Sequence, residues 1–165
     1  MNRHPLYVIA HNIRSVHNVG SFFRTCDATN VKKLYLTGYT PTPIDRFGRT
    51  RADVTKTALG AEKTVAWEQQ PDIFDLLTAL KQEGVAIVAL EQSERSLLYS
   101  EYEIKKPTAL IVGNEPDGIA EQILALCDAV IEIPMYGEKE SLNVSVSLGV
   151  ALYQLGLKKM LHPKA

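Results

Sequence analysis

The chain has 165 residues, of which 45% are hydrophobic and 22% charged, and its formal net charge at pH 7 is −1. This length and composition suit one globular domain that buries its core without disulfide bonds or structural metal ions. The near-zero charge excludes a global positive field for nucleic acids, so any such contact must depend on a local patch or on assembly.

The cysteines and the first residues indicate the compartment. Cys26 and Cys127 form neither a metal-ligand spacing nor a CxxC motif, which fits a reducing environment and predicts no metal site. The N-terminal apolar run is too short for a signal peptide or a membrane helix. We therefore expect a cytoplasmic protein that does not enter a membrane.

The first forty residues predict two strands and one helix. Apolar runs at residues 6–10 and 33–36 predict the strands. Between them, Asn18 stands where a helix N-cap is expected, and an apolar stripe follows at helical spacing: Val19, Phe22, Phe23 and Cys26. The same spacing places Arg24 roughly opposite this stripe, so we expect its side chain to point away from the core.

Residues 40–63 form a long polar segment with a net positive charge that includes Arg46, Arg49 and Arg51. A connection of this length is often functional or mobile. The segment predicts an RNA-contacting arm in which arginines bind phosphates and Phe47 is available for stacking on a base. The alternative is an ordinary solvated loop.

The remaining chain alternates between predicted strands and helices. Strands are expected at residues 64–67, 85–90, 109–112 and 129–133. Helices are expected from Pro71 to a stop at Gly84, from Ile119, and from Leu142 to about Lys159, and residues 93–103 stay unassigned. This alternation predicts an α/β fold with a parallel sheet flanked by helices.

Polar residues follow several of the predicted strands, where open α/β sheets bind ligands. One group begins at Asn12 and Arg14, another follows Gly113, and a third lies in residues 133–143, with Ser141 or Asn143 as the N-cap of the last helix. No GxGxxG or P-loop motif is present. If the protein binds a cofactor, the two late loops are the place for it.

Three blocks resemble the signature motifs of the SpoU (TrmH-like) RNA ribose methyltransferases of the SPOUT superfamily: NIRSVHNVGSFFRTCDA, LIVGNEPDGIA and IEIPMYGEKESLNVSVSLGVALYQL. They occur in the family's order, and the resemblance covers nearly the whole chain. It implies one SPOUT-type domain over residues 1–165, with a C-terminal deep trefoil knot, that forms a homodimer and binds S-adenosylmethionine. The implied reaction is methyl transfer to a ribose 2′-hydroxyl of tRNA. The alternatives are the same chemistry on rRNA, and a catalytically silent module that binds RNA or a protein partner.

The resemblance also implies the site residues. By motif position, the cofactor is expected around Leu90, Gly113, Ile133, Met135 and Leu142. The family's functional polar positions correspond to Asn18, Arg24, Glu115, Ser141 and Asn143. Arg14 is expected to bind RNA together with Arg46, Arg49 and Arg51.

The role expected of Arg24 follows from the chemistry of its side chain. A guanidinium does not readily give up a proton. We therefore expect Arg24 to stabilise the developing alkoxide and to bind the adjacent phosphate rather than to act as a general base. Pro116 departs from the family, which more often has glycine there, and its missing N–H removes one backbone donor for the cofactor.

Overall fold

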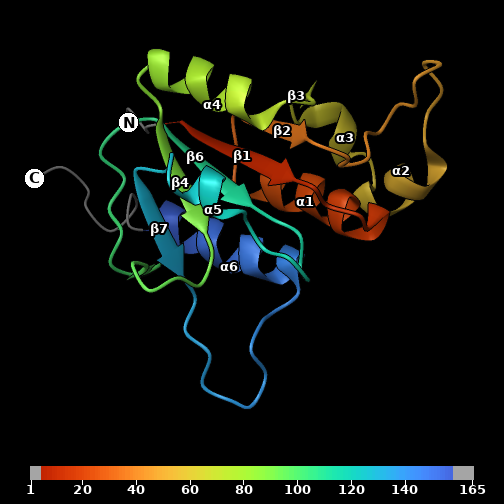
Figure 1. Ribbon diagram of the computed structural model, residues 1–165. Coiled ribbons are helices and arrows are strands. Elements are labelled where there is room, and N and C mark those ends of the chain that lie inside the picture. Colours follow the sequence, from red (N-terminus) through yellow and green to blue (C-terminus); the bar gives the residue numbers. More distant parts are fainter. Residues whose placement is uncertain (1–4, 158–165) are drawn as a thin grey trace, which may run out of the picture.

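A computed structural model describes residues 5–157 as a sheet of seven parallel strands with helices on both faces (Figure 1). The strands are β1 (Leu6–His11), β2 (Lys33–Thr37), β3 (Trp67–Gln70), β4 (Ala86–Leu90), β5 (Leu97–Leu98), β6 (Thr108–Val112) and β7 (Ala129–Glu132). The helices are α1 (Val16–Ala28), α2 (Ala52–Ala58), α3 (Ala61–Thr64), α4 (Ile73–Gln82), α5 (Glu121–Leu124) and α6 (Val144–Leu157). The predicted fold class, a parallel α/β sheet between helices, is confirmed.

The strand order is β3-β2-β1-β6-β4-β7-β5, and every neighbouring pair is parallel. Because all strands run the same way, their carboxyl ends lie at one edge of the sheet. Strand β6 lies at the centre, between β1 and β4, and pairs Leu6 with Thr108. Segments far apart in sequence are therefore neighbours along that edge.

Two hydrophobic cores lie on the two faces of the sheet, because successive strand residues point to opposite faces. In β1, Val8 belongs to one core and Ile9 to the other. The Val8 core contains buried residues of α1 and α6, whereas the Ile9 core contains those of α4 and α5. Figure 1 shows α4 on the side of the sheet opposite α1 and α6.

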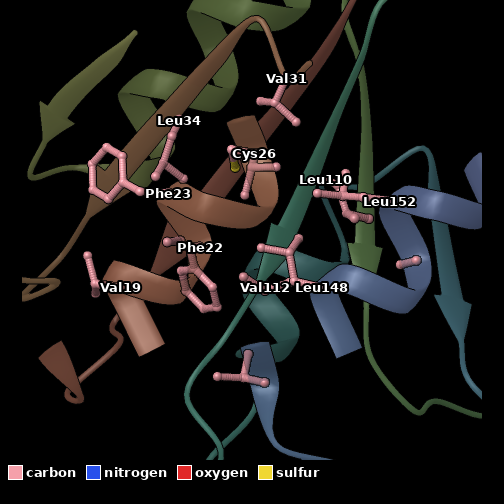
Figure 2. Packing of buried hydrophobic residues seen from close by; sticks show 14 of the residues in the cluster. Val19, Phe22, Phe23, Cys26, Val31, Leu34, Leu110, Val112, Leu148 and Leu152 are labelled. Carbon is pink, nitrogen blue, oxygen red and sulfur yellow. The ribbon is translucent and has the colours of Figure 1, made fainter. Parts of the chain in front are cut away.

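The core beneath α1 and α6 confirms the predicted apolar stripe of α1 (Figure 2). Val19, Phe22, Phe23 and Cys26 are all fully buried, and Phe23 contacts Trp67 edge-on with ring centroids 6.4 Å apart. Burying one phenylalanine side chain stabilises the fold by roughly 1.5–3 kcal/mol. The stripe therefore fixes the rotation of α1, and Arg24 is exposed, as predicted.

The predicted N-cap of α1 was wrong. Ser15 caps the helix: its Oγ accepts a hydrogen bond from the Asn18 backbone N–H at 3.2 Å. Serine and asparagine cap helices about equally well, and the hydroxyl three residues earlier takes the position. Asn18 therefore lies in the first turn, and its side chain is available for another contact.

The interpretation of residues 40–63 as a loop was also wrong for its second half. Helices α2 and α3 lie there, and Val54 and Ala58 of α2 are fully buried. Gly20 of α1 permits this packing, since an added Cβ would lie 2.6 Å from the Cβ of Thr57. So few apolar residues in a polar segment give a weak periodic signal.

Several boundaries differ from the prediction. Strand β3 begins at Trp67 instead of residue 64, and the helix expected from Ile119 is the single turn α5. Strand β5 lies in the unassigned segment. Helix α6 begins at Val144 rather than Leu142, and its expected end at Lys159 lies outside the described residues.

Two further features are absent from residues 5–157: a membrane-spanning helix and a cluster of candidate metal ligands. No helix in this range has the length and apolar character needed to cross a bilayer. Nor does this range bring three or more histidine, cysteine, aspartate or glutamate side chains together as candidate metal ligands.

Candidate active site

A cavity of about 410 Å³ lies beyond the carboxyl ends of β4, β6 and β7. Its walls come from residues 90–92, the turn after β6 and the segment after β7, which Figure 1 shows as a long extension before α6. All five residues expected to bind a cofactor line it: Leu90, Gly113, Ile133, Met135 and Leu142. Glu115 and Ser141, which were expected among the catalytic residues, line it as well.

The turn after β6 is closed by its own backbone. The N–H of Gly118 donates to the carbonyl of Asn114 at 2.8 Å, and Gly118 has a positive φ of 64°. Gly113 has no room for a side chain, because an added Cβ would lie 2.8 Å from the Gly118 carbonyl oxygen. The turn closes without an N–H from Pro116, so the proline is compatible with this wall of the cavity.

The residues that follow β4 connect the other cavity walls. One carboxylate oxygen of Glu91 accepts the N–H of Ile119 at 3.0 Å, and the other accepts the N–H of Gln92 at 2.9 Å. The Gln92 side chain donates to the carbonyl of Glu140 at 2.7 Å. Glu91 and Gln92 therefore bind both loops that surround the cavity, although the sequence analysis passed over them.

The N-terminus of α6 brings two predicted site residues together. Asn143 is its N-cap, with Oδ1 accepting the N–H of Ser145 at 2.9 Å. The Glu115 carboxylate accepts the N–H of Val144 at 3.0 Å, which places a negative charge at the positive end of the helix dipole. The Glu115 carboxylate thus joins the second sequence block to the third by accepting a backbone hydrogen bond.

Asn18 and Asn143 link the first block to the third. The Nδ2 of Asn143 donates to the Oδ1 of Asn18 at 3.3 Å, across 125 positions of sequence. Both side chains lie at the N-terminal ends of their helices, α1 and α6. The structure therefore brings two of the five expected polar residues into contact.

Arg24 stands apart from this group. It is exposed on α1, does not line the cavity, and has no ion pair or side-chain hydrogen bond to any residue in the described range 5–157. Asn18 lies too far along α1 to contact it, because six residues along a helix correspond to about 9 Å and a rotation of about 120°. The guanidinium is free to bind an incoming ligand.

The arginines after β2 form an ordered tip around Asp45. The Asp45 carboxylate accepts the N–H groups of Phe47 and Arg49, and it pairs with the Arg49 guanidinium at 2.8 Å. These bonds lower the pKa of the Asp45 carboxyl, and the bond from the Arg49 backbone N–H contributes most. Arg51 pairs with Asp53 at 3.0 Å and lowers its pKa.

Phe47 is the apex of this tip and is 66% exposed. The guanidinium carbons of Arg46 and Arg49 lie 4.7 and 5.1 Å from the centre of its ring, within cation–π distance. The ring is thus partly occupied by its own neighbours, which reduces its availability for base stacking. Arg46, which has no ion pair to a residue in the range 5–157, is the arginine of the tip with the least neutralised charge.

A second group that the sequence analysis missed lies beyond β1 and β2. Tyr39 receives a hydrogen bond on its hydroxyl from the Nδ2 of Asn114, at 2.7 Å, and Asn114 lines the cavity. The signal that could have indicated the group is Gly38, which follows β2 with a positive φ of 62°. An added Cβ at Gly38 would overlap the Oδ1 of Asn12, so only glycine fits there.

His11 ends β1 beside this group. Its Nδ1 lies 2.8 Å from the Oγ1 of Thr37, which is fully buried. Burial lowers the pKa of His11 below its usual value, because the surrounding protein disfavours the charged imidazolium. The ring therefore serves as a neutral hydrogen-bonding group near pH 7.

The fold is an α/β sheet with a cavity at its carboxyl edge, which is where open α/β sheets bind their ligands. The sequence profile described as the SpoU rRNA Methylase family matches residues 5–153, and the chain belongs to this family. The family resemblance predicted from the three sequence blocks is confirmed.

Individual relatives share most of the chain. A tRNA (guanosine(18)-2′-O)-methyltransferase of Aquifex aeolicus is 38% identical over 149 residues, which are 90% of this chain and 67% of the relative. A 23S rRNA (guanosine-2′-O-)-methyltransferase RlmB of Neisseria meningitidis is 34% identical over 157 residues, 95% of this chain and 60% of the relative. The crystal structure of an AdoMet-bound rRNA methyltransferase from Sinorhizobium meliloti has the same fold, with a TM-score of 0.85, 23% identity and coverage of 94% of this chain and 57% of that one.

Proposed function

We propose that this protein is an S-adenosylmethionine-dependent RNA methyltransferase that acts on a ribose 2′-hydroxyl. The observation that carries the proposal is the cavity of about 410 Å³, in which the five motif positions of a SpoU family member converge. Its lining combines apolar residues such as Leu90, Ile133 and Met135 with polar residues such as Gln92, Asn114 and Ser141, which is the composition of small-molecule sites. The residues present therefore fit an adenosine-containing ligand.

Five residues of the cavity would hold the cofactor: Leu90, Gly113, Ile133, Met135 and Leu142. When bound, the cofactor supplies an electrophilic sulfonium methyl group. Arg24 would bind the phosphate beside the target ribose and stabilise the charge that develops on the 2′-oxygen, because its guanidinium remains protonated. Ser141, which is exposed at the cavity wall, would orient the hydroxyl. Asn18 and Asn143 would keep the N-terminal ends of α1 and α6 at a fixed separation.

We favour tRNA as the substrate, because the relative from Aquifex aeolicus with 38% identity acts on tRNA. Methylation of rRNA is the second candidate, supported by the 34% identity to the Neisseria meningitidis enzyme. The protein would work in the cytoplasm. Four arginines on the segments that follow β1 and β2 would bind the RNA: Arg14, Arg46, Arg49 and Arg51.

The test is to incubate the purified protein with methyl-labelled S-adenosylmethionine and with total tRNA or total rRNA from a strain that lacks its gene. We expect label in tRNA, at a ribose 2′-oxygen that is unmethylated in the deletion strain. Label in rRNA alone would move the proposal to its second candidate. No transfer to either RNA would contradict the enzyme assignment and leave the silent binding module.

The homodimer implied by the family is part of the proposal, and one face of α6 supports it. Val146 and Tyr153 are 50% and 53% exposed, and Gly149 and Val150 lie between them at helical spacing. An added Cβ at Gly149 would meet only Thr25, at 3.9 Å, so nothing within residues 5–157 requires a glycine there. Close approach of a second copy would explain its retention in a helix, where glycine costs about 1 kcal/mol relative to alanine.

Sedimentation at micromolar concentration tests the dimer. We expect a dimer for the parent and a shift toward monomer for Val146→Asp, which places a charge on the apolar face of α6. A parent that sediments only as a monomer would contradict the proposal. The C-terminal trefoil knot is also part of the proposal, because the chain belongs to the SpoU family and the resemblance implies it.

A further inference from the structure

We infer that Tyr39 is a stacking platform for the base of the nucleotide that is methylated. The inference rests on the proposed function, and it assigns the reaction a substrate-positioning residue outside the three family blocks. It starts from an exposed aromatic ring, since Tyr39 is 52% exposed although three groups of the protein hold it in place.

The three contacts fix different parts of the residue. Its backbone N–H donates to the Oδ1 of Asn12 at 3.2 Å, and its hydroxyl accepts from the Nδ2 of Asn114 at 2.7 Å. The Arg14 guanidinium carbon lies 5.9 Å from the centre of the ring, at the limit of a cation–π contact. The ring is therefore oriented before any ligand arrives, and ordering it on binding costs little entropy.

The local backbone is built for this arrangement at some energetic cost. Asn12 has a positive φ of 53°, which is uncommon for a residue other than glycine, and its N–H donates to the carbonyl of Thr37 at 3.2 Å. Gly38 also has a positive φ and lies against the side chain of Asn12. Residues keep such conformations where many contacts with the surrounding structure hold them in place. They are concentrated at functional sites.

The position of the ring relative to the cavity identifies its ligand. Asn114, which is buried, contacts Tyr39 and also lines the proposed cofactor cavity. A ribose presented to that cavity carries its base within reach of neighbouring side chains. Unstacked RNA bases are bound by aromatic rings and guanidinium planes, and Tyr39 with Arg14 offers one of each at the cavity edge.

Phe47, an exposed aromatic ring on the same connection after β2, is less suited to the role. Phe47, at the apex of the arginine tip, has two guanidinium groups close to its ring, and no hydrogen bond links it to a cavity residue. Among the described residues, Tyr39 has one guanidinium neighbour, and it has a direct bond to the cavity wall. The inference therefore assigns RNA phosphate binding to the arginine tip and base stacking to Tyr39.

The experiment measures single-turnover methylation at increasing RNA concentration, using the full chain and the RNA that the parent protein methylates. Tyr39→Leu removes the aromatic ring and keeps apolar bulk. It is expected to raise the half-saturating RNA concentration by roughly 5- to 150-fold, the range for loss of one stacked base. Tyr39→Phe keeps the ring and should recover most of that loss. The S-adenosylmethionine affinity of both variants, measured by calorimetric titration, should match that of the parent.

A second RNA localises the contact to one base. In this probe the methylated nucleotide is replaced by an abasic ribonucleotide, which keeps the 2′-hydroxyl. If Tyr39 stacks on that base, the parent binds the abasic RNA more weakly, and Tyr39→Leu adds no further loss. Equal losses for intact and abasic RNA, or parental behaviour of Tyr39→Leu, would overturn the inference while the methyltransferase assignment stands. Failure of the parent to methylate any RNA would overturn both.

Discussion

The carboxyl edge of the sheet has two halves that are built in different ways. Beyond β4, β6 and β7, the cavity walls are loops whose amides and carbonyls bond to one another or to the carboxylates of Glu91 and Glu115. Beyond β1 and β2, and along α1, the exposed groups are side chains that include Arg14, Arg24 and Arg46. We refer to these as the cofactor half and the RNA half.

The difference follows from what each half would bind. A small cofactor can be enclosed in a cavity lined mainly by apolar groups, with a few polar groups to orient it. RNA presents phosphates and bases to an open surface, where guanidinium groups and aromatic rings bind them. Asn18 and Asn143 form the hydrogen bond that joins the two halves. Substitutions should therefore separate cofactor binding, RNA binding and methyl transfer.

The largest effect is expected at Arg24, in the RNA half. Arg24→Ala should slow single-turnover methyl transfer by roughly 100-fold or more, because stabilisation of the developing oxyanion is lost. The affinity for S-adenosylmethionine and the free energy of unfolding should stay near the parental values, since the side chain is exposed and outside the cavity. Arg24→Lys is the matched control that keeps the charge. A parental transfer rate for Arg24→Ala would contradict the proposed mechanism.

A smaller effect is expected at Asn143, where the halves meet. Asn143→Ala removes both the cap of α6 and the bond to Asn18, so we expect a loss of stability of about 1 kcal/mol. Cofactor affinity, turnover or both should fall by roughly 10-fold, the equivalent of one hydrogen bond. Asn143→Asp keeps the capping oxygen and loses the donor to Asn18. If it behaves like the parent in turnover, the bond between the halves has no functional role.

Neutralisation of the arginine tip should affect RNA affinity alone. Replacing Arg46, Arg49 and Arg51 by glutamine should weaken binding roughly fivefold at moderate salt and reduce the salt slope by about 1–2. The effect is limited because Asp45 and Asp53 already pair with two of the three. Arg46→Gln alone should give the largest single loss. Unchanged RNA affinity and slope in titrations at several salt concentrations would reduce the segment to an ordinary surface loop.

The smallest effect concerns the pH dependence of stability near His11. Its folded pKa is lowered, so the unfolded chain binds a proton more readily than the folded protein. The contribution of neutral His11 to the free energy of unfolding should be fully present above the ordinary pKa of about 6.5. It should fall as the pH drops below that value, toward the folded pKa. In denaturant titrations between pH 7 and pH 5, His11→Asn should show a smaller decrease than the parent. Equal decreases would exclude this residue as a contributor.

The sequence predicted the cofactor half better than the RNA half. Fully apolar strands such as β4 and β6 and the glycines beside them give strong signals, and the residues taken from the family blocks converge on one cavity. The apolar stripe of α1 was equally clear. In each of these elements, local pattern and tertiary burial agree.

The errors occurred where burial is slight or where two residues compete for one position. Helix α2 has only two buried residues, and β3 is a polar edge strand, so neither has a marked apolar period. Ser15 and Asn18 are both good N-caps, and only the folded chain decides between them. Tyr39 and Asn114 are 75 positions apart, and no local pattern predicts such a pair.

The central position of β6 has a consequence for the kinetics of folding. Its pairing of Leu6 with Thr108 and the contact of Asn18 with Asn143 both close very long loops, which is entropically costly and slows folding. Helices such as α1 and α4 require only local contacts and can form early. During refolding, recovery of helical signal should therefore precede recovery of cofactor binding, and a chain with much of its secondary structure would still lack a site.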